Sequence, residues 1–217
     1  MNETHEIKAR VFYSKTKQAC YIAHLDTIDI ICKALRRLQL PYQVTQGHHV
    51  RPKISFGSPL PLGHASRCEQ FVLCLESMVD DQWLKEGLSQ QLPDGMDIIS
   101  VELPCKEEKK GANGDLVDYT FGFTSPETAE KAGEFLSNPE TTFSLVSKGR
   151  MKEYRLGQAL QAINKSSDGN LQLINARFIQ GKPEVPSVSK IVTALAEFLG
   201  EQKDNLVQIE RVSLTKL

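Results

Sequence analysis

The sequence has no long hydrophobic run. Its 217 residues contain no stretch of about 18 uncharged apolar residues, which is roughly the length that a membrane-spanning helix needs. Residues 1–20 also lack the apolar core of a secretory signal peptide. We therefore expect a cytoplasmic protein that does not associate with a membrane.

Paired cysteines and nucleotide-binding motifs are also missing. The five cysteines are an odd number and none belongs to a CxxC pair, which argues against a disulfide framework or a zinc ribbon. The patterns GxxxxGK[ST], GxGxxG and GxSxG do not occur, so a P-loop, a dinucleotide fold and a nucleophile elbow are not indicated. No cofactor is expected.

The chain has almost no net charge, but its charges are unevenly distributed. With 26 basic and 27 acidic residues, the protein as a whole has no attraction for polyanions. Residues 24–67, however, carry six basic residues against Asp26 and Asp29, a local charge of +4. Such asymmetry predicts a surface that binds RNA or a partner, although basic residues near a helix end also complement its dipole. The six are Lys33, Arg36, Arg37, Arg51, Lys53 and Arg67.

Residues 47–64, GHHVRPKISFGSPLPLGH, have the most unusual composition in the chain. They contain three Gly, three Pro and three His and no acidic residue. A stiff segment of this kind suits either a binding site or a plain connection between strands. His48, His49 and His64 are added to the predicted binding residues. They could also bind a metal with His24, but no HxxxH or HxH spacing supports this, and no metal site is predicted.

The pattern of the first half predicts the order strand, helix, strand, strand, helix, strand. This is the order of a split βαβ, or ferredoxin-like, unit. The strands are expected at 7–14, 42–46, 69–77 and 96–104, with 19–23 as a hairpin partner or continuation of the first strand. The helices are expected at 27–38, capped by Asp26 or Thr27, and at 80–92.

The second half repeats this order less clearly. Strands are predicted at 117–124, 141–147, 171–179 and 206–214, and a short helix at 155–163. Longer helices should follow Ser125 and cover 187–200, the latter with Phe198 facing inward. We therefore predict an α+β protein of two pseudo-duplicated ferredoxin-like units, whose antiparallel sheets carry helices on one face. The units are 1–105 and 117–217, joined by a linker at 106–116.

Two residues could act in catalysis. Asp26 follows His24 closely, and an aspartate at the mouth of a cleft can act as a general base or a nucleophile. Capping of the following helix is the alternative role for Asp26. These patterns do not decide whether the protein is an enzyme, but they favour a protein without catalytic activity.

Residues 23–70 resemble a bacterial family of radical-SAM-linked proteins of unknown function, DUF2344. The shared pattern includes His24-Leu25-Asp26, Arg36-Arg37 before Leu40-Pro41, Ile54-Ser55-Phe56, Pro59-Leu60-Pro61-Leu62-Gly63, Ser66 and Glu69. The chain departs from the family where Ala23 replaces a serine and where residues 48–51 replace Phe-Asn-Pro-His. It lacks the CxxxCxxC cluster motif and is therefore not itself a radical SAM enzyme.

The resemblance implies an accessory or substrate-presenting partner of a radical SAM enzyme, in a setting that suggests RNA metabolism. An alternative is an RNA-modifying enzyme with Asp26 as its catalytic residue, because paired ferredoxin-like units also resemble pseudouridine synthases. A third possibility is a structural interaction module.

Overall fold

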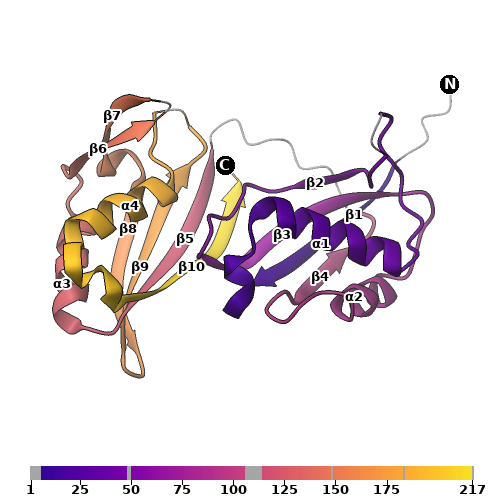
Figure 1. The fold of residues 1–217 in the computed structure, drawn as a ribbon, viewed down its shortest axis with the longest axis horizontal. Helices are drawn as coiled ribbons and strands as arrows, with labels where there is room; N and C mark the ends of the chain where they lie inside the picture. The colour runs from indigo at the N-terminus through magenta and orange to yellow at the C-terminus, as the bar shows by residue number, and fades with distance from the viewer. Residues whose placement is uncertain (1–5, 48–49, 106–113, 148, 183, 217) are drawn as a thin grey trace. The chain divides into compact units, whose positions relative to one another are not determined.

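The computed structural model describes residues 6–47, 50–105, 114–147, 149–182 and 184–216. The chain divides into two compact units, 1–108 and 109–217, each with its own hydrophobic core. Each unit combines antiparallel strands with two α-helices, so the predicted α+β class is confirmed (Figure 1). No helix in the described ranges is both long and apolar enough to cross a bilayer.

Unit 1 is built around four antiparallel strands in the order β4-β1-β3-β2. The 3-10 helix η1 connects β1 to α1, and α2 connects β3 to β4. The elements are β1 (Ile7–Lys15), η1 (Lys17–Tyr21), α1 (His24–Arg37), β2 (Ile54–Phe56), β3 (Ala65–Leu75), α2 (Asp81–Ser89) and β4 (Ile98–Glu102).

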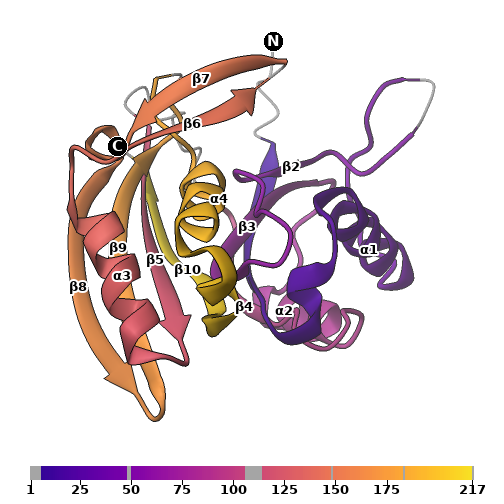
Figure 2. The same ribbon diagram turned by 60° about the vertical axis from the view of Figure 1, so that its left-hand side comes forward.

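Alternation along β1 and β3 places one face of this sheet against the helices. Val11 lies opposite Phe71 and Ala9 lies opposite Leu73, and all four side chains are buried. Figure 2 shows α1 and α2 on the same face of the sheet. The buried side chains of the two helices complete the core, among them Ile31, Leu35, Leu84 and Leu88.

Two predicted strands of unit 1 are wrong. Residues 19–23 belong mainly to η1, because the hydrogen bonds of Ala19 and Ile22 close short turns rather than a ladder. Residues 42–46 form only isolated bridges at Tyr42 and Val44, and the second strand is instead β2. A three-residue strand inside a Gly- and Pro-rich segment is too short to give a periodic signal.

Unit 2 has a main sheet in the order β10-β5-β9-β8 and a separate two-stranded sheet, β6-β7. The helices α3 and α4 pack on one face of the main sheet, where Phe121, Phe178, Leu136 and Leu195 are buried (Figure 2). The elements are β5 (Asp115–Phe123), α3 (Pro126–Ser137), β6 (Thr142–Ser147), β7 (Arg150–Arg155), η2 (Leu156–Gln158), β8 (Leu160–Asp168), β9 (Leu171–Gln180), α4 (Val188–Leu199), η3 (Gly200–Asn205) and β10 (Leu206–Lys216).

The predicted helix at 155–163 is wrong. The segment contains the end of β7, the single turn η2 and the start of β8. Leu156 and Ala159 are buried as a helical period would require, but the tertiary pairing of β8 with β9 decides the outcome. Most of the predicted linker lies outside the described residues, and its last two residues belong to β5.

The helix starts of α2 and α3 follow the sequence signals. Asp80 accepts a hydrogen bond from the Trp83 amide at 2.7 Å, and Ser125 accepts one from the Thr128 amide at 3.3 Å. Both are side-chain N-caps, as predicted for Ser125. Helix α4 ends at Gly200 as expected, but Phe198 is 53% exposed and not inward.

Candidate functional site

Helix α1 carries five of the eleven predicted site residues, namely His24, Asp26, Lys33, Arg36 and Arg37. It begins at His24, with Ala23 as an N-cap that makes no side-chain hydrogen bond. The predicted capping role of Asp26 or Thr27 is therefore wrong, because both residues lie inside the first turn. The Thr27 hydroxyl donates to the Ala23 carbonyl at 3.0 Å, and the Asp26 side chain is exposed.

Three exposed basic residues gather on the outer side of α1 and the neighbouring segment. Lys33 forms an ion pair with Asp29 at 2.7 Å. The hydrogen bond from Lys33 holds the pKa of Asp29 below its usual value, and the charges of Arg36 and Arg51 lower this pKa further. The charges of Arg36 and Arg51 therefore act on the same carboxylate although fifteen positions separate them in the chain. We call Lys33, Arg36 and Arg51 the basic surface.

The remaining predicted binding residues have other surroundings. Arg37 donates from Nε to the Gln91 side chain and from Nη2 to the Gln91 carbonyl, both at 2.8 Å. This ties the end of α1 to the segment after α2. Lys53 pairs with Glu6, and this hydrogen bond raises the pKa of Lys53. Arg67 is exposed on β3.

The predicted histidines do not share one surface. His64 is 4% exposed, so its ring is not presented to solvent. The ring of His24 meets that of Phe56 edge to face, with centroids 5.9 Å apart. His48 and His49 lie outside the described residues. Within the described ranges, no group of three His, Cys, Asp or Glu side chains is arranged to hold a metal ion.

A group of buried polar residues beside α1 escaped the sequence prediction. Lys15 is 2% exposed, Glu69 is 8% exposed and Ser66 is fully buried. Lys15 lies opposite Ser66 in the β1–β3 ladder, and Tyr13 lies opposite Glu69. Burial lowers the pKa of the Lys15 ammonium, while the charges of Glu69 and Cys20 oppose this shift.

The Lys15 ammonium contacts the chain just before α1. It donates a hydrogen bond to the Ile22 carbonyl at 2.5 Å. The sequence did contain a signal for this residue, because Lys15 extends the inward series Ala9, Val11 and Tyr13 at a spacing of two. A lysine at an inward strand position requires a buried partner.

The Pro- and Gly-rich segment is attached next to this buried group. The Gly63 amide donates to the Cys20 carbonyl at 2.9 Å. Leu60 is buried, whereas Leu62 is 64% exposed and Tyr21 is 67% exposed. The segment is therefore fixed to η1, and each of the two presents a large apolar side chain to solvent, Leu62 and Tyr21.

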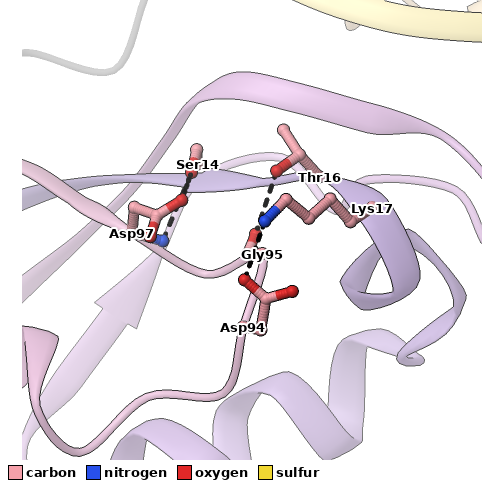
Figure 3. A network of polar contacts seen from close by, with 6 residues as sticks. All are labelled: Ser14, Thr16, Lys17, Asp94, Gly95 and Asp97. Carbon is pink, nitrogen blue, oxygen red and sulfur yellow. Dashed lines mark hydrogen bonds and ion pairs between the residues drawn. The ribbon is translucent and has the colours of Figure 1, made fainter.

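The start of η1 is held from the other side by the turn before β4. Figure 3 shows three contacts in a row: Ser14 with Asp97, Thr16 with Gly95, and Lys17 with Asp94. The Thr16 amide also donates to the Gly95 carbonyl at 2.8 Å. These bonds fix the end of β1, from which Lys15 reaches Ile22.

Comparison with known proteins identifies the family. Residues 8–192 match the model described as "Uncharacterized protein conserved in bacteria (DUF2344)". The chain belongs to the DUF2344 family.

Two further comparisons give no information on the function of this DUF2344 chain. No curated protein matches it. A solved structure described as "Crystal Structure of an Unknown Protein from Galdieria sulphuraria" is 12% identical and covers 98% of each chain, with a TM-score of 0.27. A similarity this low supports no inference about fold or function.

Proposed function

We propose that this DUF2344 protein is a non-catalytic accessory protein that holds RNA for a partner radical SAM enzyme, in the cytoplasm. The observation that carries the RNA part is the exposure of Lys33, Arg36 and Arg51, of which both arginines are near enough to Asp29 for their charges to lower its pKa. With Lys33, this side of α1 has three cations and two carboxylates, because the exposed Asp26 lies three positions before Asp29 on the same side. Exposed guanidinium groups suit phosphate contacts, which supply most of the affinity in nonspecific nucleic-acid binding.

The partner part of the proposal has support from exposed apolar residues of unit 1. Tyr21, Leu25 and Leu62 are each more than 60% exposed. Large apolar side chains in such positions are typical of protein–protein contacts when they form a contiguous patch. They come from η1, the first turn of α1 and the segment fixed to η1 by Gly63.

We propose further that each unit is a ferredoxin-like repeat. The order β4-β1-β3-β2 of unit 1 corresponds to the order β10-β5-β9-β8 of unit 2, and each unit has two helices on one face. The β6–β7 hairpin is then an insertion of the second repeat. No feature of Asp26 beyond its exposure supports the pseudouridine-synthase alternative.

The experiment compares RNA affinity in wild-type protein, in the double variant Arg36→Ala/Arg51→Ala, and in a control. The control Lys165→Ala/Lys203→Ala removes two exposed lysines of unit 2, so the change in net charge is the same. We expect the first variant alone to weaken binding and to reduce the dependence of affinity on salt. Equal binding by all three proteins, or none by any, would refute the RNA part. Failure to co-purify with any radical SAM protein from the cells that produce it would refute the partner part.

A further inference from the structure

Unit 2 has an open groove where the chain passes from α4 into η3. The groove has a volume of about 750 Å³, and its lining residues all belong to α4 or η3. In Figure 2, α4 lies over the main sheet of unit 2, and the chain continues from the end of the helix towards β10. Pockets that hold small ligands have volumes of roughly 300–1,000 Å³. The groove is therefore large enough to receive several side chains of another molecule.

The floor of the groove is apolar, because small and aliphatic residues recur every four positions along α4. Val192, Ala196 and Gly200 follow this spacing, so they form one row along the helix. Val192 and Ala196 are half-buried, and Val192 also packs against the core of unit 2. A Cβ atom at Gly200 would meet nothing within 4 Å, so this end of the row is open. The row spans about 12 Å, roughly the length of four residues of an extended peptide.

The rim of the groove is mainly acidic. Glu197, Glu201 and Asp204 line it and are exposed, and Lys203 is the one cation among the lining residues. None of the three carboxylates forms an ion pair with another residue in the described part of the chain. Three carboxylates against one ammonium give the lining a charge of −2.

The neighbouring polar groups have partners of their own. Lys131 of α3 reaches η3, but its ammonium donates to the Gln202 side chain at 3.0 Å and pairs with Glu127 at 3.4 Å. The Thr193 hydroxyl, which also lines the groove, donates to the Ser189 carbonyl at 3.0 Å. The groove therefore offers a ligand negative charge and hydrogen-bond acceptors above an apolar floor.

We propose that the α4–η3 groove binds a short basic segment of a partner protein. Arginine or lysine side chains of the segment meet the carboxylates of the rim, and an apolar side chain packs on the row at Val192 and Ala196. Charge complementarity selects this occupant, because an acidic rim repels nucleic acid and anionic lipid. Guanidinium groups in particular pair with carboxylates through two parallel hydrogen bonds. The groove is also open rather than enclosed, which suits an extended chain better than a small organic cation.

This inference goes beyond the proposed function and requires neither RNA nor a radical SAM enzyme. The probe is a phage-displayed library of short random peptides, selected on the full-length protein. The most enriched peptide is then labelled, and its affinity for wild type and for variants is measured by fluorescence anisotropy.

Two variants change the groove, and each has a matched control in unit 2. Glu197→Gln/Glu201→Gln removes two charges of the rim, and Glu153→Gln/Asp168→Asn removes two exposed carboxylates of β7 and β8. Ala196→Leu fills the floor without changing the charge, and Ala162→Leu adds the same side chain at an exposed position of β8. Thermal unfolding of each variant checks that it is folded.

We expect the enriched peptides to combine arginine or lysine with at least one apolar residue. Glu197→Gln/Glu201→Gln should weaken binding about five-fold or more, since two exposed charge pairs are lost, and should reduce its dependence on salt. Ala196→Leu should weaken binding about ten-fold or more and leave the salt dependence unchanged, because it removes space and no charge. Both controls should bind as the wild type does.

Several results would overturn the inference. One is a selection that enriches no peptide, or only peptides without basic residues. Another is equal affinity of the groove variants and their controls. Binding of spermine in calorimetry, lost in Glu197→Gln/Glu201→Gln and accompanied by no peptide enrichment, would make the groove a site for small cations. Self-association of the wild type that Ala196→Leu abolishes would make the occupant a second copy of the chain.

Discussion

The ammonium of Lys15 and the carbonyl of Ile22 are joined by a hydrogen bond of 2.5 Å, although Lys15 is only 2% exposed. A buried lysine is costly unless its donors are satisfied. Here the bond joins the end of β1 to the residue two positions before α1. It therefore fixes the position at which the helix carrying the basic surface begins.

Replacing this lysine should destabilise the protein. Lys15→Met leaves the Ile22 carbonyl without this donor and removes a buried positive charge that interacts with Glu69, so we expect a loss of about 3 kcal/mol in the free energy of unfolding. Lys15→Met/Glu69→Gln should lose less than the two single changes summed. Urea titration measures both, and additive losses would show that the two charges do not interact.

The same residue predicts a pH effect. Because burial lowers the pKa of Lys15, the unfolded state binds more protons than the folded state between the folded pKa and the ordinary value of 10.5. The contribution of Lys15 to stability therefore rises with pH in this window. The difference in free energy of unfolding between wild type and Lys15→Met should widen as the pH approaches 10.5. A constant difference across this range would contradict the prediction.

Gly95 should not tolerate a side chain. Its φ is +84°, and a Cβ atom would lie 2.3 Å from the Thr16 carbonyl oxygen, in the contacts of Figure 3. We expect Gly95→Ala to cost about 3 kcal/mol, from the disfavoured backbone and the clash together. Gly149→Ala is the matched control, because φ there is +75° but nothing lies within 4 Å of the added atom. Its loss should be about 1 kcal/mol, and equal losses would remove the clash as the cause.

Two adjacent arginines on α1 should have different roles, Arg37 in stability and Arg36 in RNA binding. Arg37→Ala breaks two hydrogen bonds to Gln91 and should lower the free energy of unfolding by about 1 kcal/mol, with little effect on RNA affinity. Arg36→Ala should leave stability within about 0.5 kcal/mol of wild type but weaken RNA binding. Thermal unfolding and anisotropy on the two variants check this, and the reverse pattern would place the binding role on Arg37.

Acid should lower the stability of unit 2, because the carboxylate of Asp118 becomes protonated. Arg177 donates two hydrogen bonds to this carboxylate, at 2.7 and 3.0 Å, and Ser213 donates a third at 2.6 Å. The hydrogen bonds from Arg177 lower the pKa of Asp118, and the hydrogen bond from Ser213 lowers it further. The stabilisation is therefore present above the ordinary value of 3.8 and is lost as the pH falls through the folded pKa.

Asp118→Asn should cost about 1 kcal/mol at neutral pH, a figure reduced for the solvent exposure of the pair. The variant should also lose less stability than wild type on acidification. Asp168→Asn, at the exposed end of β8, is the control and should behave as the wild type. If Asp118→Asn loses as much stability on acidification as the wild type, Asp118 is not the group responsible.

The sequence was most informative where one local signal agreed with burial. The alternation of β1 and β3 and the Ser125 cap lead to the observed elements. Local signals failed at β2 and β8. The first is three residues long, and the second owes its conformation to pairing with β9 across the sheet.

The sequence predicted the binding residues only as a group of basic side chains and did not show which of them are available for binding. Nothing in the sequence distinguishes Arg36 from Arg37, and the difference arises because Gln91, 54 residues along the chain, meets only Arg37. His64 could not be recognised as buried, because histidine is common both inside and outside proteins. Lys15 was recognisable in principle from its inward register.

The position of Trp83 gives unit 1 a spectroscopic signal of its own. It is the single tryptophan of the sequence and lies in the first turn of α2, so its fluorescence emission comes from unit 1 alone. Circular dichroism, in contrast, reports the helices and strands of both units. Denaturation followed by both signals will reveal whether the two units unfold in one cooperative step, with coincident curves, or in two.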